Sequence, residues 1–374
     1  MLSIFIVENI SMSLGANATI MAAGANIATT LSTILCFFYL YKYYKDVRYK
    51  IKKEIKNTKK IKPARIRKTL KDILYISIPM TISGILSTIN KNIDSMTVVR
   101  GLKNFLSEEQ AKIQYGILSG KVDTLVTLPM SLNMAFSTAL IPATASAKAL
   151  KDEKTIEKRI SFSILVTILI GLPCMVGMIT FAEPILRLLF PNATSGKVIF
   201  QVSSVSIIFV VLEQTICGAL HGIGKVFSTS LALGVGVIIK LILNIVLIPI
   251  EPNKCIVGGT VGAAFATIIC HLTAVVIEIN ILKRQIDIKL NLAKYVVKPI
   301  VAVFVMSLFS YGTYIILLNK INPNISTIIS MCMAITVYFG MVIILKIFTR
   351  EELLMIPYGK KIYKVLEEIG LYKN

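Results

Sequence analysis

Long apolar stretches alternate with short polar segments along most of this chain. A helix needs about 20 predominantly apolar residues to cross the hydrocarbon core of a membrane. Stretches of that length recur along the chain and predict about nine transmembrane helices, and roughly ten-residue alternating strands that would indicate a membrane barrel are absent. The predicted spans are 17–41, 73–98, 117–146, 160–183, 198–221, 226–250, 257–282, 295–318 and 325–348.

Composition supports an all-α, polytopic membrane bundle. Hydrophobic residues make up 55% of the chain and charged residues only 16%. Soluble domains carry about 25% charged residues, so this chain has too few to cover a water-facing surface of its size. We therefore expect a multi-pass membrane protein with no soluble domain of its own.

The net charge of +21 first suggests a nucleic-acid partner, but the positions of the basic residues exclude it. If the segment between the first two spans faces the cytoplasm, 30 of the 41 Lys and Arg residues lie in cytoplasmic segments. Such a bias determines the orientation of membrane proteins. The charge therefore predicts topology, with the carboxyl terminus in the cytoplasm and the amino terminus outside.

The sequence shows no signal of enzyme chemistry. It contains no C-x-x-C pair, P-loop, G-x-S-x-G or H-E-x-x-H motif, so we predict no catalytic residue, metal or cofactor. The six cysteines lie mostly in apolar runs and are expected to serve as packing residues. A polytopic membrane enzyme ranks low, because the longest outer loop, about 100–116, carries only two acidic residues, Glu108 and Glu109.

Two similar segments suggest an internal repeat. Residues 24–29 read Gly-Ala-Asn-Ile-Ala-Thr and residues 262–267 read Gly-Ala-Ala-Phe-Ala-Thr, and both open a predicted span. Transporters are commonly built from such repeats, so the first span would be the last helix of an earlier lobe. The alternative is chance, because small residues recur wherever membrane helices pack closely.

The most distinctive segment of the chain is LPMSLNMAFSTALIPATASAKAL at 128–150. Supporting stretches are Ile78-Pro79, DSMTVVR from Asp94, ALHGIGK from Ala219, KLILNIVLIP from Lys240 and VGGTVGAAFAT from Val257. Together these segments resemble the MOP flippase superfamily, and within it stage V sporulation protein B and the polysaccharide-biosynthesis flippases. Members have fourteen helices, and the resemblance maps the nine spans onto helices six to fourteen. It thus implies that the first five helices are absent, as in a truncated or split reading frame.

The resemblance also implies a division of the chain into five parts. These are a remnant of the amino-terminal lobe (1–41), a basic cytoplasmic linker between lobes (42–72), a six-helix carboxyl-terminal lobe (73–282), two additional helices (283–348) and a cytoplasmic tail (349–374). Within the tail, the apolar spacing at 352–372 fits either an amphipathic helix on the membrane surface or a solvated segment.

Charged residues inside the spans are the candidate substrate-binding groups, because charge within a membrane is costly and usually functional. Lys91 and Asp94 lie in the outer third of the second span, and Lys121 and Asp123 lie at similar depth in the third. They fit either a cluster lining a cavity or side chains that reach the outer interface and pair there. Arg100 closes the second span. The lipid II flippases carry an Asp-Arg pair where this chain has Asp123 and Thr124, which weakens lipid II as the substrate.

A second group of candidates lies in the later spans. Lys240 and Asn244 share one helical face, with Lys240 near the middle of the membrane. Glu213 is a potential ion-pair partner of Lys240. His271 fits a neutral packing histidine better than a member of a proton relay.

The favoured function is a flippase that moves a lipid-linked, anionic saccharide precursor across the cytoplasmic membrane by alternating access, with cell-wall or spore-cortex precursors implied by the resemblance. The expected partners are this substrate, membrane lipids and a separately encoded amino-terminal lobe, and no nucleic acid. The alternatives are a cation-coupled multidrug exporter of the same superfamily and a non-functional truncated fragment.

Overall fold

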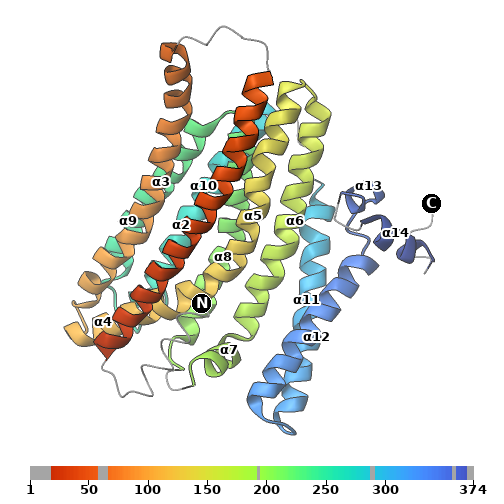
Figure 1. Ribbon diagram of the computed structural model, residues 1–374. Coiled ribbons are helices and arrows are strands. Elements are labelled where there is room, and N and C mark those ends of the chain that lie inside the picture. Colours follow the sequence, from red (N-terminus) through yellow and green to blue (C-terminus); the bar gives the residue numbers. More distant parts are fainter. Residues whose placement is uncertain (1–17, 58–65, 192–193, 287–290, 356–358, 369–374) are drawn as a thin grey trace. The chain divides into compact units, whose positions relative to one another are not determined.

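The computed structural model describes residues 18–57, 66–191, 194–286, 291–355 and 359–368, which form helices joined by short connections and include no strand (Figure 1). The long helices are α2 (Ala18–Asn57), α3 (Ile66–Leu102), α5 (Asp123–Ala149), α6 (Glu153–Thr180), α8 (Lys197–Gly222), α9 (Val226–Leu247), α10 (Gly259–Gln285), α11 (Lys298–Leu318) and α12 (Pro323–Ile344). The short ones are α4 (Glu108–Gly116), α7 (Ala182–Leu189), α13 (Arg350–Leu353), α14 (Gly359–Glu368) and two π-helical segments, Ile117–Val122 and Ala293–Val297. Parts of the predicted remnant (1–17), linker (58–65) and tail (356–358 and 369–374) lie outside the described residues.

The prediction of a polytopic all-α membrane bundle is confirmed. Eight of the described helical segments are long and apolar enough to cross a membrane, judged by length and composition. They coincide with the second to ninth predicted spans. The chain divides into two compact units, Met1–Leu70 and Lys71–Asn374, and all eight of these segments lie wholly or largely in the second.

In the first unit, α2 extends well beyond the predicted end of the first span at residue 41. It continues to Asn57, through the basic segment that the sequence indicated as a linker. Residues 42–57 contain no Gly or Pro and are rich in Lys. Because straight-chain residues such as Lys favour the helix and no residue there breaks it, the helix continues.

Three short helices lie where the sequence indicated loops or left alternatives open. In the predicted outer loop, α4 begins with a capping box. The backbone amide of Gln110 donates to Ser107 Oγ, and the backbone amide of Ser107 donates to Gln110 Oε1. Another short helix, α7, follows α6 directly. In the tail, Gly359–Glu368 is helical and Tyr363 is buried beside Leu353, while the location of this helix on the membrane surface stays a prediction.

Small residues allow the helices of the second unit to pack closely. A Cβ atom on Gly222 of α8 would lie 2.3 Å from Thr144 Oγ1 of α5, and one on Gly218 would lie 2.7 Å from Ser137 O. This is the small-residue packing typical of membrane helices. Helices α5, α6, α8, α9 and α10 form the body of the unit, and the α11–α12 pair packs against α6 (Figure 1).

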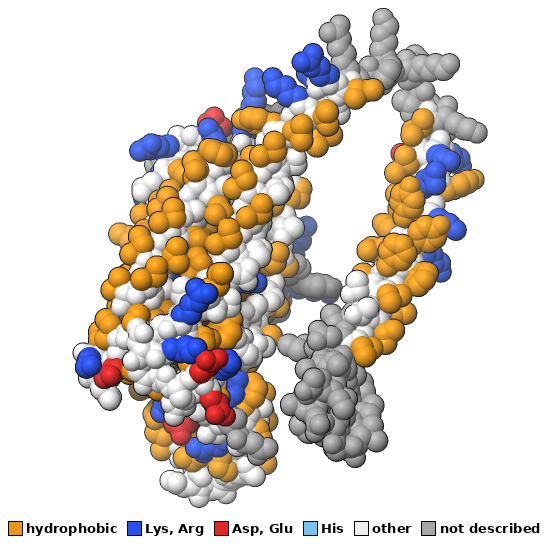
Figure 2. All heavy atoms as spheres, turned by 90° about the vertical axis from the view of Figure 1, so that its left-hand side faces the viewer, with side chains coloured by type: hydrophobic (Ala, Val, Ile, Leu, Met, Phe, Trp, Pro, Cys, Tyr) orange, Lys and Arg blue, Asp and Glu red, His pale blue; other side chains and the backbone are white. Residues whose placement is uncertain are grey.

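The outer face of α3 and α9 is apolar over its middle. Figure 2 shows hydrophobic side chains there, with Lys and Arg gathered toward the two ends. The side chains of Ile85, Ile89, Ile238 and Ile242 are all more than 40% exposed. This pattern is typical of a surface that faces lipid.

Candidate functional site

Polar side chains join α3 to the bundle. The Ser83 and Ser230 hydroxyls lie 2.6 Å apart, and Ser230 donates to the Pro79 carbonyl at 2.9 Å. The connection therefore runs from α3 to α9 through hydrogen bonds, which membrane helices use where apolar packing gives little preference over lipid.

The strongest part of this connection is a buried ion pair. Lys240 Nζ of α9 lies 2.6 Å from Asp94 Oδ2 of α3 and donates to the Asn90 carbonyl at 3.0 Å. Asn244 Nδ2 donates to Asp94 Oδ1 at 2.9 Å and to Thr97 Oγ1 at 3.0 Å. Both carboxylate oxygens of Asp94 are therefore bound by groups of α9.

Because the pair is buried, removing either partner is expected to destabilise the protein. The side chain of Lys240 is 2% exposed, whereas that of Asp94 is 18% exposed. Burying either charge alone costs several kcal/mol, on the order of 3–5 when one partner is removed. Lys240 is thus paired with a partner that keeps some access to its surroundings.

Close approach of α10 fixes the position of Lys240. A Cβ atom on Gly236, one turn before Lys240, would lie 2.5 Å from the Cys270 carbonyl. Only glycine allows α10 to pack this tightly against α9. Gly236, Lys240 and Asn244 follow one another at intervals of four residues, so the close contact with α10 and the buried charge lie on the same side of α9.

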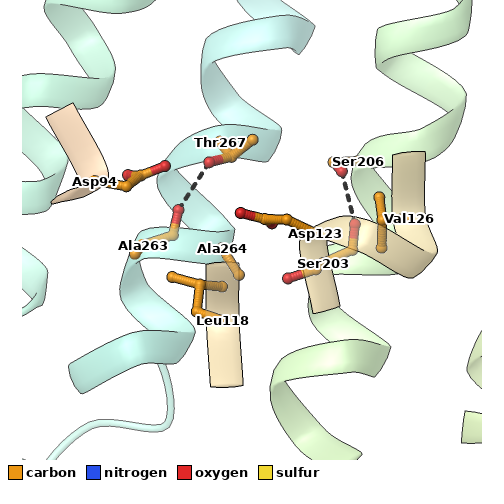
Figure 3. Close-up of a pocket in the computed structure, with 9 residues that line it drawn as sticks. All are labelled: Asp94, Leu118, Asp123, Val126, Ser203, Ser206, Ala263, Ala264 and Thr267. Carbon is orange, nitrogen blue, oxygen red and sulfur yellow. Dashed lines mark hydrogen bonds between the residues drawn. The ribbon is translucent and has the colours of Figure 1, made fainter. Parts of the chain in front are cut away.

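Asp94 also borders a small pocket between α3, α5, α8 and α10. Figure 3 shows the carboxyl groups of Asp94 and Asp123 directed toward each other across it. The Thr267 and Ser206 hydroxyls there donate to carbonyl oxygens of their own helices, to Ala263 and Ser203 respectively. The pocket has room of about 20 Å³, enough for one water molecule. It is far too small for a saccharide headgroup in this conformation.

A much larger pocket of about 820 Å³ opens at the end of the unit where α8 ends and α9 begins, which we call the basic end. Its volume lies within the range of sites for small organic ligands, about 300–1,000 Å³. Lys71 and Tyr75 of α3 line it, with His221 and Lys225 on the other side.

The structure brings together only some of the predicted site residues. Asp94, Lys240 and Asn244 form one network, and Asp123 meets Asp94 at the small pocket. Lys91 and Arg100 are exposed on α3. Lys121 lies with its Nζ 5.5 Å from the centre of the Phe190 ring.

The expectation that Glu213 pairs with Lys240 is wrong. Glu213 of α8 instead pairs with His271 of α10, with its Oε2 at His271 Nδ1. The side chain of Lys240 points toward α3 and pairs with Asp94. The spacing of residues along a span predicts which of them share a helical face, but it does not predict which other helix packs against that face.

Sequence reasoning missed two members of the network, Asn90 and Thr97. Both lie on the same face of α3 as Asp94, at spacings of four and three residues. This spacing was readable in the sequence. Lys91, which was predicted from the sequence as a candidate, is exposed, whereas Asn90 beside it is buried.

These features define a polytopic helical membrane protein with polar groups buried between its helices. The chain matches the family described as "Lipid II flippase MurJ" over residues 3–332. It belongs to that family.

Individual relatives agree with this assignment. The chain is 27% identical to "Uncharacterized membrane protein YabM" of Bacillus subtilis (strain 168) over 79% of its length and 55% of the relative. It is 25% identical to "Stage V sporulation protein B" of the same organism over 90% of its length and 63% of the relative. The resemblance to the MOP flippases noted in the sequence is confirmed, and the chain spans only about three fifths of these relatives.

A solved structure shares the fold. "Lipid II flippase MurJ, inward closed conformation" superimposes with a TM-score of 0.56 over 92% of this chain and 65% of that one, at 19% identity. At this level of identity the likeness concerns the fold.

Proposed function

We propose that this chain is part of a flippase that moves a lipid-linked, anionic saccharide precursor from the inner to the outer leaflet of the bacterial cytoplasmic membrane. Membership of the MurJ family supports the flippase class. A diphosphate-linked sugar carries charge and hydroxyl groups that cannot cross hydrocarbon unaided. The similarity to a protein named for stage V of sporulation makes spore-wall precursors our first choice of substrate.

The Asp94–Lys240 pair is the observation that carries this proposal. Lys240 has a buried ammonium whose partner, Asp94, is the more exposed of the two. We propose that, when the site opens, an anionic headgroup replaces Asp94 as the partner of Lys240, so that the charge is never left unpaired in the membrane. Lys91, Arg100, Lys121, Asp123 and Asn244 are proposed to border the same path.

The basic end is proposed to face the cytoplasm, together with the carboxyl terminus. Basic residues concentrate in the connections at that end, as the positive-inside rule requires. The pocket lined by Lys71 and Lys225 would then receive the anionic headgroup from the inner leaflet.

Alternating access requires two lobes that move about a shared site. We propose that the helices of the second unit, α3 to α10, act as one lobe. The other would be contributed either by a preceding part of the same polypeptide or by a separately encoded one.

Translocation of fluorescent lipid-linked saccharides in proteoliposomes tests this function. The protein is purified through a carboxyl-terminal tag, so that any accompanying lobe is retained. We expect faster movement of a diphosphate-linked saccharide than in protein-free liposomes. Efflux of cationic drugs without movement of the lipid would indicate a multidrug exporter instead. Comparing lipid II with a simpler lipid-linked saccharide tests the substrate, because Thr124 stands where lipid II flippases have Arg.

A further inference from the structure

A second set of buried ionisable side chains lies apart from the Asp94–Lys240 network, between α8 and α10. Glu213 of α8 binds His271 of α10, and both side chains are nearly buried, at 13% and 14% exposure. Glu213 lies in the second half of its 26-residue helix. The proposed path of the substrate uses neither of these residues.

Glu278 is the unusual member of this set. Its side chain is on the same face of α10 as His271, two turns or about 10 Å further along. Glu278 is 1% exposed, and its Oε2 is buried with no hydrogen-bond partner among the residues that the structure describes. An unpartnered carboxylate in such a place is strongly disfavoured and is expected to be neutralised by a bound proton or cation.

The groups around Glu278 favour a proton. Across the described part of the chain, no group of three or more His, Cys, Asp or Glu side chains is arranged to hold a metal ion. On the packed helix α8, Glu213 and Cys217 interact electrostatically with Glu278. Lys240 of α9 forms its ion pair with Asp94 and not with Glu278.

A row of polar groups leads from this set to the basic end. Cys217 lies one turn beyond Glu213 on α8, and its Sγ is 3.4 Å from His221 Nε2, one further turn along. The same His221 nitrogen lies 2.9 Å from Thr229 Oγ1 of α9. His221 lines the 820 Å³ pocket. Lys148 and Lys225 flank this end, where Lys148 donates to the Ile223 carbonyl.

We propose that Glu278, together with the Glu213–His271 pair, forms a proton-binding site that exchanges protons with the pocket at the basic end by way of His221. On the basis of the proposed function, the proton bound here is the ion whose movement drives the transport cycle. A proton taken up by Glu278 removes a buried charge, which changes how α8 and α10 can move in the membrane.

Infrared difference spectroscopy of the whole protein in lipid nanodiscs tests the site without any transport. We expect a change of pH to produce a carboxylic C=O band of a buried group, and Glu278→Gln to remove it. Glu251→Gln, in an exposed loop position, serves as the matched control and should leave the band in place. Glu213→Gln should shift the band, since Glu213 shares the site.

Two results would overturn the proposal. One is a band that persists unchanged in Glu278→Gln. The other is a carboxyl signal that responds to Na⁺ at constant pH, which would identify a metal cation as the ligand.

A transport measurement then separates this proposal from the function on which it rests. In proteoliposomes, a pH gradient should accelerate lipid translocation by the wild-type protein and have no effect on Glu278→Gln. Acceleration that persists in Glu278→Gln contradicts the coupling. If the wild-type protein moves no lipid while the infrared band behaves as expected, the flippase function fails and the proton site stands.

Discussion

At the scale of single residues, the second unit places its charged groups in two separate environments. Asp94 and Lys240 neutralise each other between α3 and α9, whereas Glu278 is buried without a partner for Oε2 among the described residues. The first arrangement favours exchange of an anion, because one charge can be replaced by another of the same sign. The second favours exchange of a proton.

The buried ion pair predicts unequal effects of two kinds of mutation. Asp94→Asn leaves the Lys240 ammonium buried without its counter-ion and should lower stability by about 3–5 kcal/mol. The double variant Asp94→Asn with Lys240→Met should recover much of this loss. Thermal unfolding in detergent measures both. The exposed pair Glu251–Lys254 is the control, and its removal should change stability by less than about 1 kcal/mol.

Additive losses in the double variant would contradict this account. They would show that the two side chains contribute to stability independently, with no interaction energy between them.

Asp152 predicts a dependence of stability on pH at the start of α6. Hydrogen bonds from the Thr155 hydroxyl and amide hold the pKa of the Asp152 carboxyl below its ordinary value. Its stabilising effect is therefore complete above the ordinary pKa and is lost as the pH falls toward the lowered value. Asp152→Asn keeps the cap without the titration. The melting temperature of the wild type should fall relative to Asp152→Asn on acidification, and a constant difference would argue against the cap.

At the scale of the helices, α5 and α8 of the second unit pack closely against each other. Asn133 of α5 donates to the Val211 carbonyl and accepts from Thr167 of α6, so three helices share one buried polar residue. Gly218 and Gly222 allow this contact by removing side chains from the interface.

Gly222→Ala should therefore destabilise the unit, since the new methyl group would meet Thr144 and the Ile141 carbonyl. Overpacking of this kind costs about 1–3 kcal/mol. Gly312→Ala in α11, where a Cβ atom meets nothing within 4 Å, is the control and should be neutral or slightly stabilising. Equal melting temperatures for the two variants would refute the tight α5–α8 contact.

The helices were predictable from the sequence, but the site was predictable only in part. Apolar stretches of membrane length identify a span wherever it occurs, and eight of the nine predicted spans coincide with such helices. Asp94 and Lys240 were found because a charged residue in a span is rare, and Asn244 because it shares a helical face with Lys240. Their pairing was not, because spacing along one helix does not say which helix lies opposite. Glu213 was therefore assigned to the wrong partner, and Glu278 was overlooked near the end of a span.

At the scale of the whole molecule, the proposed entrance for the headgroup requires that the basic end of the bundle faces the cytoplasm. Reporter fusions after Lys225 and after Lys254 test it, because they lie in successive connections at opposite ends of the bundle. A fluorescent protein that folds only in the cytoplasm should be active after Lys225, and alkaline phosphatase, which requires export, after Lys254. The reverse pattern would place the basic end outside and remove the proposed entrance for the headgroup.

The most direct test of the central claim is the rate at which the purified protein moves a diphosphate-linked fluorescent saccharide in proteoliposomes, with and without the charge at position 240. We predict that the wild type and Lys254→Met translocate the lipid, and that Lys240→Met, purified in its folded fraction, loses most of this activity. Translocation by Lys240→Met at the wild-type rate would contradict the claim that this buried lysine receives the anionic headgroup.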